Sequence, residues 1–140
     1  MKRALLAVAF AFALAAPALA QQKVAVMYKA AGCGCCDGHA EHLRANGYKV
    51  RVVELADLEP VKRKHSVPAA QAGCHTLEVG GYVVEGHVPA RIIDKLLAEK
   101  PRIKGISLPG MPDGSPGMSG TKTAPFTVYE LGTDKVFAVD

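Results

Sequence analysis

Three of the four cysteines of this 140-residue chain lie within four positions, in the stretch Gly32-Cys33-Gly34-Cys35-Cys36. The stretch follows an apolar run, Val24–Tyr28, which is typical of a buried strand, and it precedes a segment with helical character. Cysteines three positions apart can close on one metal ion or form one disulfide. A third thiol between them can bridge a second metal ion or hold a mixed disulfide. The cluster therefore predicts chemistry, rather than packing, at a strand-to-helix turn.

The first 20 residues have the features of an export signal. Met1-Lys2-Arg3 is basic, residues 4–16 are apolar, and Pro17-Ala18-Leu19-Ala20 ends in an A-x-A cleavage pattern. The apolar run is too short for a convincing membrane anchor. We therefore predict cleavage after Ala20, export to the periplasm, no membrane span after cleavage, and a single mature domain over residues 21–140.

The charge of the chain argues against nucleic acid as a partner. The formal net charge is +4 with neutral histidines, and loss of Lys2 and Arg3 with the signal lowers it to +2. Such a weak and scattered positive charge gives no basis for binding a phosphate backbone.

Four cysteines in an oxidising compartment could also form two structural disulfides, with three possible connectivities. The spacing argues against this interpretation. A bond between the neighbours Cys35 and Cys36 needs a strained peptide, and one from Cys33 to Cys35 closes a very tight ring. Only a Cys33–Cys36 disulfide is comfortable within the cluster.

Hydrophobic patterns predict the element order β-α-β-α-β-β-α. After the first strand come a helix capped by Asp37 and ending at Asn46-Gly47, a strand at 48–55, a short helix at 58–64, a hairpin at 77–85 around Gly80-Gly81, and a helix from Pro89 to Lys100. This is the order of a thioredoxin-like α/β fold. In that fold a dithiol lies where the first strand enters the first helix, whose N-terminus lowers the pKa of a thiol.

The C-terminal third adds to that core. A short apolar segment at 103–108 is followed by a Gly/Pro-rich loop at 109–120 that is too long for a simple connector. Residues 126–131 and 135–138 are typical of a closing hairpin. The sequence shows no internal repeat and no second domain.

Cys74-His75 is the second chemical signal, because it directly precedes the predicted hairpin. In a thioredoxin-like fold this segment faces the dithiol, so the Cys74 sulfur is expected beside the first three cysteines. Four thiols around one point are more than disulfide exchange needs, and they suit a metal site. An inert buried Cys74 is the alternative, and for His75 a surface or supporting position is weighted equally with ligation.

The other histidines are weaker candidates. His87 follows the hairpin and is weighted evenly between a functional and a solvated side chain. His39 and His42 share a helical face, for which two exposed histidines is the favoured interpretation. His65 follows a Lys/Arg run and is expected to face water.

Met111 and Met118 each follow a glycine in the Gly/Pro loop, where they do not fill the centre of a helix or sheet face. A thioether is a soft ligand that suits Cu(I). Anchoring of the loop at the surface is the alternative for both. Met27, within the first strand, is expected in the core.

The donor types favour copper over other metals. Thiolates and thioethers with imidazole nearby select Cu(I), or Zn(II) if only Cys and His ligate. The Cys-x-Cys-Cys spacing matches neither the usual zinc-finger patterns nor a ferredoxin-type iron–sulfur motif. Several Cu(I) ions sharing bridging thiolates fit a sulfur-rich, crowded turn.

Four stretches of the chain resemble the CopG-type family of small periplasmic copper-resistance proteins, long catalogued as a metal-binding domain of unknown function. They are Gly32–Cys36, Cys74-His75-Thr76, Gly80–Pro89, and the Gly/Pro loop with Pro109-Gly110-Met111-Pro112 and Gly114-Ser115-Pro116-Gly117-Met118. The resemblance runs from about Val24 to the C-terminus, in the same order. Asp37-Gly38 is a departure, since many relatives have a bulky residue there.

The resemblance implies a thioredoxin-like fold that holds several copper ions in a cysteine-bridged cluster, with cycling between Cu(I) and Cu(II) as a proposed activity. It implies sulfur ligands at Cys33, Cys35, Cys36 and Cys74, with His87, Met111 and Met118 beside them. Storage, copper oxidoreductase activity and transfer to other periplasmic copper-handling proteins as a chaperone all stay open. The alternative from another class is a thiol–disulfide oxidoreductase that uses Cys33 and Cys36.

Overall fold

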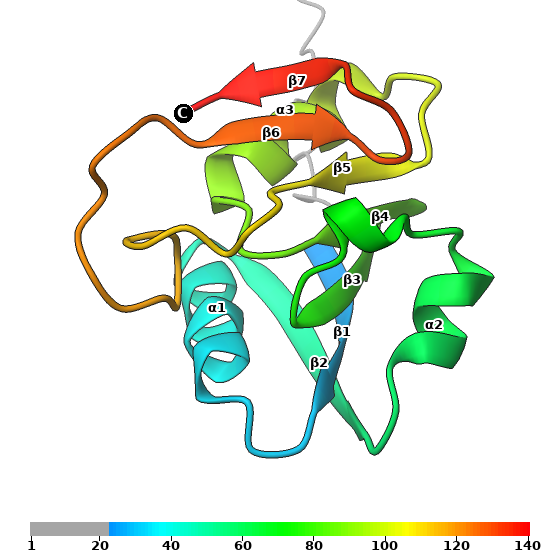
Figure 1. Ribbon diagram of the computed structural model, residues 1–140, viewed down its shortest axis with the longest axis vertical. Helices are drawn as coiled ribbons and strands as arrows, with labels where there is room; N and C mark the ends of the chain where they lie inside the picture. Colours follow the sequence, from blue (N-terminus) through cyan, green and yellow to red (C-terminus); the bar gives the residue numbers. More distant parts are fainter. Residues whose placement is uncertain (1–22) are drawn as a thin grey trace, which may run out of the picture.

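The computed structural model describes residues 23–140 and arranges them around one seven-stranded mixed sheet (Figure 1). Residues 1–22, with the predicted signal peptide, lie outside the described residues. No helix within 23–140 is long and apolar enough to cross a bilayer. The elements are β1 (Lys23–Ala30), α1 (Gly34–Ala45), β2 (Tyr48–Leu55), α2 (Glu59–Lys64), the 3-10 turn η1 (Ala69–Gln71), β3 (His75–Val79), β4 (Tyr82–Glu85), α3 (Ala90–Glu99), β5 (Gly105–Ser107), β6 (Thr127–Glu130) and β7 (Val136–Val139).

The predicted order of helices and strands is confirmed, and the sheet extends it. The strand order is β2-β1-β3-β4-β5-β6-β7, with β1 parallel to β2 and antiparallel to β3. Gly80 and Gly81 turn the β3–β4 hairpin with φ of +56° and +86°, a conformation that two glycines adopt without steric cost. The apolar segment at 103–108 contributes β5, which pairs parallel to β4, and the closing hairpin is β6–β7.

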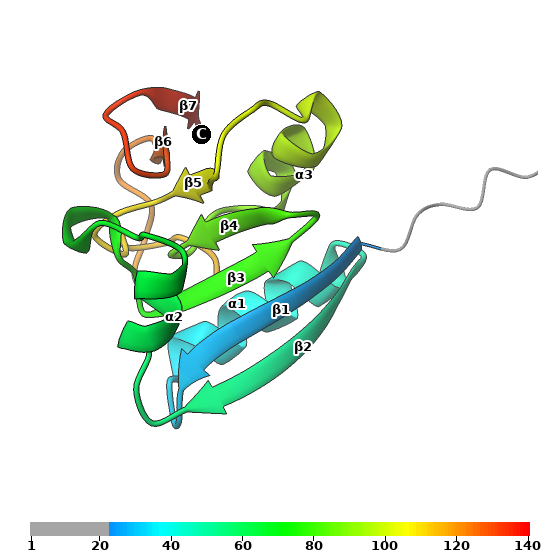
Figure 2. The same ribbon diagram turned by 90° about the vertical axis from the view of Figure 1, so that its right-hand side faces the viewer.

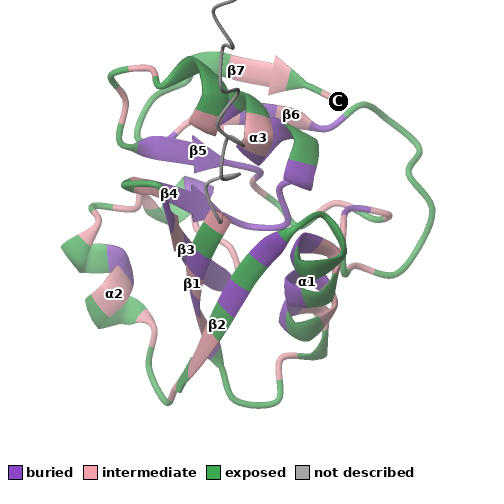
Figure 3. Ribbon diagram, turned by 180° about the vertical axis from the view of Figure 1, so that it is seen from behind, coloured by how far each residue is buried: buried purple, intermediate pink, exposed green. Residues whose placement is uncertain are grey.

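The helices cover both faces of the sheet and enclose its core. Figures 1 and 2 show α1 and α2 on opposite sides of β1, β2 and β3. Buried residues concentrate in the central strands, while the outer sides of the helices are exposed (Figure 3). Met27, Leu43, Leu77 and Leu96 have no exposed surface, and burial of each such side chain contributes about 1.5–3 kcal/mol.

The start of α1 differs from the prediction that Asp37 caps the helix. The helix begins at Gly34, so Cys35 and Cys36 lie in its first turn and Cys33 is the N-cap residue. The amide of Asp37 donates to the Cys33 carbonyl at 3.2 Å, which makes Cys33 the first helical acceptor. The Asp37 side chain instead forms an ion pair with the buried Lys29 at 3.0 Å.

The Gly/Pro loop returns to α1 and lies against its first turns. The backbone of Gly117 packs on Gly38 so closely that a Cβ at Gly117 would overlap the carbonyl oxygen of Cys35 and the amide nitrogen of His39. Gly117 also has a φ of +87°, which side chains rarely adopt. A small residue on each side of this contact therefore holds the loop against the cysteine-bearing end of α1.

Replacing Gly117 with alanine should destabilise the protein more than the same change at Gly110. Both glycines have left-handed backbones, with φ of +87° and +77°, but a Cβ at Gly110 meets nothing within 4 Å. We expect Gly110→Ala to cost about 1 kcal/mol and Gly117→Ala to cost about 1–3 kcal/mol more, because overpacking adds to the backbone strain. Urea unfolding of both variants measures this difference, and equal losses would contradict the close contact.

Candidate metal centre

The pairing of β1 with β3 brings the two cysteine segments together. The strands run antiparallel with Lys29 opposite His75, so the end of β1 lies beside the start of β3. The chain leaves β1 into Cys33–Cys36 and enters β3 directly after Cys74. The predicted position of Cys74 beside the other three cysteines is therefore confirmed, while the role of these residues as ligands stays a prediction.

The four sulfur atoms form one compact cluster in two chemical states. Cys33 and Cys36 form a disulfide, whereas Cys35 and Cys74 are free thiols. The Cys74 Sγ lies 3.3 Å from the Cys36 Sγ and 3.8 Å from the Cys35 Sγ. One disulfide rather than two is present, and it is the pair that the spacing of the cluster favours.

Two imidazoles also lie close to the Cys74 sulfur. The Sγ of Cys74 lies 3.0 Å from Nε2 of His87 and 3.4 Å from Nδ1 of His75. Both histidines are fully buried. Cys74 is therefore shared between a group of four sulfurs and a group formed with His75 and His87, and the potential ligand atoms within each group lie within 4.8 Å of one another.

Each imidazole near Cys74 is fixed by a further hydrogen bond. Nδ1 of His87 donates to the carbonyl oxygen of Pro116 at 2.7 Å, within the Gly/Pro loop. The His75 ring bonds through Nε2 to Nδ1 of His39 at 2.7 Å, and Nε2 of His39 donates to the Val88 carbonyl at 2.9 Å. Residues from α1, β3, the segment after β4 and the Gly/Pro loop thus meet at Cys74.

The expectation that His39 is exposed is wrong, because its side chain is fully buried and bonded to His75. A signal for this position exists in the sequence. Cys36, His39, Ala40 and Leu43 lie at i, i+3, i+4 and i+7 and form the buried stripe of α1. His39 occupies a core position of that stripe, although a polar side chain normally suggests a surface position.

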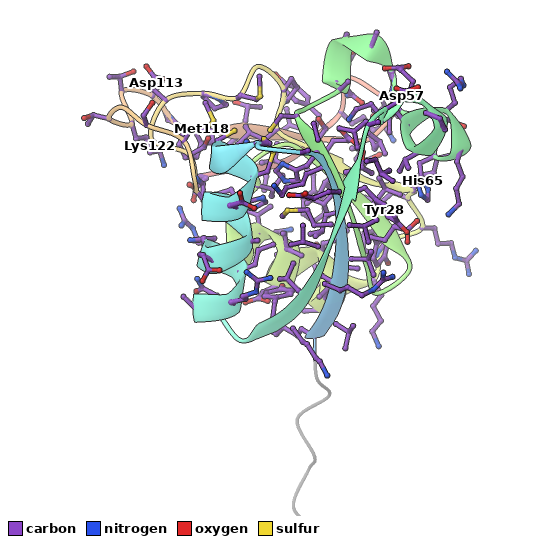
Figure 4. The ribbon with its side chains drawn as sticks, turned by 90° about the horizontal axis from the view of Figure 1, so that it is seen from below. Tyr28, Asp57, His65, Asp113, Met118 and Lys122 are labelled. Atoms are coloured by element: carbon purple, nitrogen blue, oxygen red, sulfur yellow. A yellow bond between two sulfur atoms is a disulfide. The ribbon has the colours of Figure 1, made fainter. Side chains whose placement is uncertain are left out.

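The other two weak candidates do not join the site. His42 is half-buried rather than exposed, and its Nε2 accepts from the amide of Ala90 at the start of α3. His65 does not face water freely. It is half-buried and its Nε2 lies 2.7 Å from a carboxylate oxygen of Glu78, on the α2 side of the sheet with Tyr28 (Figure 4).

Burial sets the protonation state of the site. It lowers the pKa of His39 to about 3 and that of His75 well below its ordinary value. It also lowers the pKa of His87. Burial, with the neighbouring Cys35, raises the pKa of the Cys74 thiol to about 12. At neutral pH the three imidazoles are neutral, which is the form that binds metals, and Cys74 carries its proton.

A buried ion pair holds the residue before Cys74. The Glu85 carboxylate accepts from the amide of Gly73 at 2.9 Å and from Lys62 Nζ at 2.9 Å. The hydroxyl of Thr76 donates to the same carboxylate. Since Glu85 is fully buried and Lys62 nearly so, this network fixes the start of β3 from the face opposite His75.

The two loop methionines occupy different surroundings. Met118 is half-buried and lies beside α1, next to the Gly117 contact, whereas Asp113 and Lys122 lie farther out on the loop (Figure 4). Met111 is 38% exposed and has a left-handed backbone. The structure thus brings Met118, but not Met111, into a partly enclosed position at the helix that carries the cysteines.

Comparisons with known proteins agree with this arrangement. The family model "Protein of unknown function, DUF411" matches residues 71–118, which include Cys74, His75 and His87. A solved structure of copper resistance protein CopG, form 2, is 40% identical with a TM-score of 0.79, covering 86% of this chain and 99% of that one. Form 1 of that protein is also 40% identical, with a TM-score of 0.76, and the match covers 84% of this chain and 96% of that one. No curated protein matches.

Fold and site together define a small mixed α/β protein with a sulfur-rich candidate metal centre at one end of its sheet. The chain belongs to the CopG family of copper resistance proteins. The resemblance in the sequence is thereby confirmed across nearly the whole described chain.

Alkylation should be slow at Cys74. A pKa of about 12 instead of 9.0 lowers the thiolate fraction at pH 8 roughly a thousandfold, and the thiolate is the reactive form. We expect iodoacetamide to modify Cys74 at least a hundredfold more slowly in the folded protein than in urea, with the rate rising as pH increases. Mass spectrometry of the tryptic peptides measures the rate of modification, and equal rates in folded and unfolded protein would contradict the raised pKa of the half-buried thiol.

Proposed function

We propose that the protein is an exported periplasmic copper-binding protein of copper resistance, and that its thioredoxin-like domain holds several Cu(I) ions on a cysteine-bridged site. The observation that carries the proposal is the group of Cys33, Cys35, Cys36 and Cys74, whose sulfur atoms lie within 4.8 Å of one another. The relatives named for copper resistance support the choice of metal. The basic, then apolar, then small-residue pattern of residues 1–20 supports export.

The proposed thioredoxin-like class rests on element order and the place of the cysteines. β1, α1 and β2 form a parallel crossover unit, and β3, β4 and α3 follow as in that architecture. The cysteines lie at the junction of β1 and α1. Amides at the N-terminus of α1 point toward this junction and stabilise negative charge there.

The number and softness of the donors favour a multinuclear Cu(I) site. A thiolate sulfur can bridge two Cu(I) ions, so four sulfurs at these separations can hold more than one ion. His87 lies 3.0 Å from the Cys74 sulfur and can add an imidazole ligand. Met118, and Met111 from the exposed part of the loop, can add thioethers, which are soft ligands.

Full use of the four sulfurs requires reduction of the Cys33–Cys36 disulfide. A dithiol reductant supplies two electrons and two protons, the S–S bond breaks, and two thiols form while the reductant becomes a disulfide. Each thiol that binds Cu(I) then loses its single proton to solvent, whether its sulfur holds one ion or bridges two. The state of this disulfide thus sets how many sulfur ligands the protein offers.

Anaerobic loading of the reduced protein with Cu(I) tests the proposal. We expect more than one copper per chain by elemental analysis and mainly sulfur neighbours by X-ray absorption at the copper edge. Cys35→Ser and Cys74→Ser should each lower the copper content, because each removes a donor from the cluster. His65→Ala, on the α2 side, is the matched control and should leave it unchanged. Fewer than one copper per chain, with no loss in the serine variants, would refute the proposal.

A second candidate function is thiol–disulfide exchange, which the Cys33–Cys36 disulfide at the start of α1 favours. Exchange needs only these two cysteines, so it should survive the double change Cys35→Ser/Cys74→Ser. Insulin reduction by that double variant separates the two functions. If the protein binds copper and does not exchange disulfides, as we expect, the variant should show no activity above that of a Cys33→Ser control. Activity equal to that of wild type would favour the oxidoreductase.

A further inference from the structure

Hydrogen bonds to backbone carbonyls fix the proton positions on the three buried histidines. A carbonyl oxygen only accepts, so His39 carries a proton on Nε2, toward Val88, and His87 carries one on Nδ1, toward Pro116. A neutral His39 then has a free lone pair on Nδ1, which accepts from Nε2 of His75 at 2.7 Å. Nδ1 of His75 and Nε2 of His87 are consequently both unprotonated, and both face the Cys74 sulfur.

This arrangement has two acceptors and one proton. The Cys74 S–H can donate to Nε2 of His87 at 3.0 Å or to Nδ1 of His75 at 3.4 Å, but not to both. His75 is fully buried, so its nitrogen lies out of reach of bulk water. A buried polar atom without a hydrogen-bond partner is costly and calls for an explanation. A second proton would place a charge on a buried imidazole, which burial opposes.

We propose that Cys74, His75 and His87 form a metal site of their own, which binds one Cu(I) while the Cys33–Cys36 disulfide is intact. The choice of copper rests on the proposed function, but the ligand set does not. Two imidazole lone pairs and one sulfur converge on one position, and thiolate with imidazole is a combination that suits copper or zinc. A cation there would satisfy both nitrogens at once.

Charge balance favours a monovalent ion. Binding of Cu(I) displaces the Cys74 proton, which leaves to solvent, and a Cu–S bond replaces the S–H bond. One positive charge replaces another, so the buried site stays neutral. A divalent ion would leave one uncompensated positive charge among side chains that are themselves neutral, and burying such a charge is expensive.

The site does not depend on reduction of the disulfide. Cys33 and Cys36 are bonded to each other, and Cys74 is free. His75 and His87 take their orientation from His39 and Pro116, which are outside the sulfur cluster. The four-sulfur cluster therefore changes its donor number with redox state, whereas the Cys74–His75–His87 site keeps its three donors.

A variant that lacks the other three cysteines isolates the site. We expect Cys33→Ser/Cys35→Ser/Cys36→Ser to bind one Cu(I) in anaerobic competition with a chromophoric chelator, with one sulfur and two nitrogen neighbours by X-ray absorption. Adding His75→Ala or His87→Ala should weaken binding at least tenfold. Adding His42→Ala, on the same helix as His39 but outside the site, should change it less than twofold.

Absence of Cu(I) binding by the folded triple variant, or a copper with only sulfur neighbours, would overturn the inference. Because Cys36 is buried, the same titration is also run on wild-type protein with the disulfide intact, in which one nitrogen-coordinated Cu(I) is expected. Several coppers in reduced wild type with none in either of these forms would leave the proposed function standing and refute only this site. One copper in each of these forms, and no more than one in reduced wild type, would refute only the four-sulfur cluster.

His39 is assigned as the positioning residue of this site, since it fixes the tautomer of His75. Loss of such an outer partner typically lowers metal affinity 10–100-fold. We expect that loss in His39→Leu, which removes the acceptor. The amide of His39→Gln can accept from His75 and donate to Val88, so it should restore affinity to within about threefold of wild type. Equal Cu(I) affinities of the two folded variants would overturn the assignment.

Discussion

The antiparallel pairing of β1 with β3 is the constraint on which the site depends. Its register places Met27 opposite Leu77 and Lys29 opposite His75. Side chains alternate across a strand, so a slip of one residue would turn His75 away from α1 and present Thr76 in its place. Such a slip would also turn Leu77 and Val79, the buried apolar residues of β3, away from this core, at a cost of about 1.5–3 kcal/mol each. Ordinary core packing thus fixes where the chemical groups meet.

The start of β3 is held from both faces of the sheet by buried polar groups. On one face, His75 bonds to His39 of α1. On the other, Thr76 and Gly73 bond to Glu85, which pairs with Lys62 of α2. Removing one partner of a buried ion pair typically costs about 3–5 kcal/mol, so this clamp resists local opening. Cys74, between the two clamped positions, has little freedom to move away from the other sulfurs.

The element order and the position of Cys74 were predictable because both follow from local patterns and from known strand connections. The start of α1 was not, because Asp37 is a good capping residue whose carboxylate Lys29 engages instead. The burial of His39 follows the helical period through Cys36 and Leu43, although the polarity of a histidine predicts a surface position. The contact between Gly117 and Gly38 joins segments far apart in the sequence, and neither glycine signals it alone.

The chemistry around Cys74 likewise depends on groups from distant parts of the chain, which local sequence patterns do not bring together. Its neighbours Cys35, His75 and His87 lie on three segments of the chain. Burial among these segments, together with Cys35, raises the pKa of the thiol. A half-buried thiol that holds its proton beside neutral imidazoles is a poor nucleophile and a poor site for a divalent ion. Exchange of that proton for a soft monovalent cation leaves the buried charge unchanged and satisfies both imidazoles. The burial that suppresses disulfide exchange at Cys74 is therefore the same property that favours Cu(I).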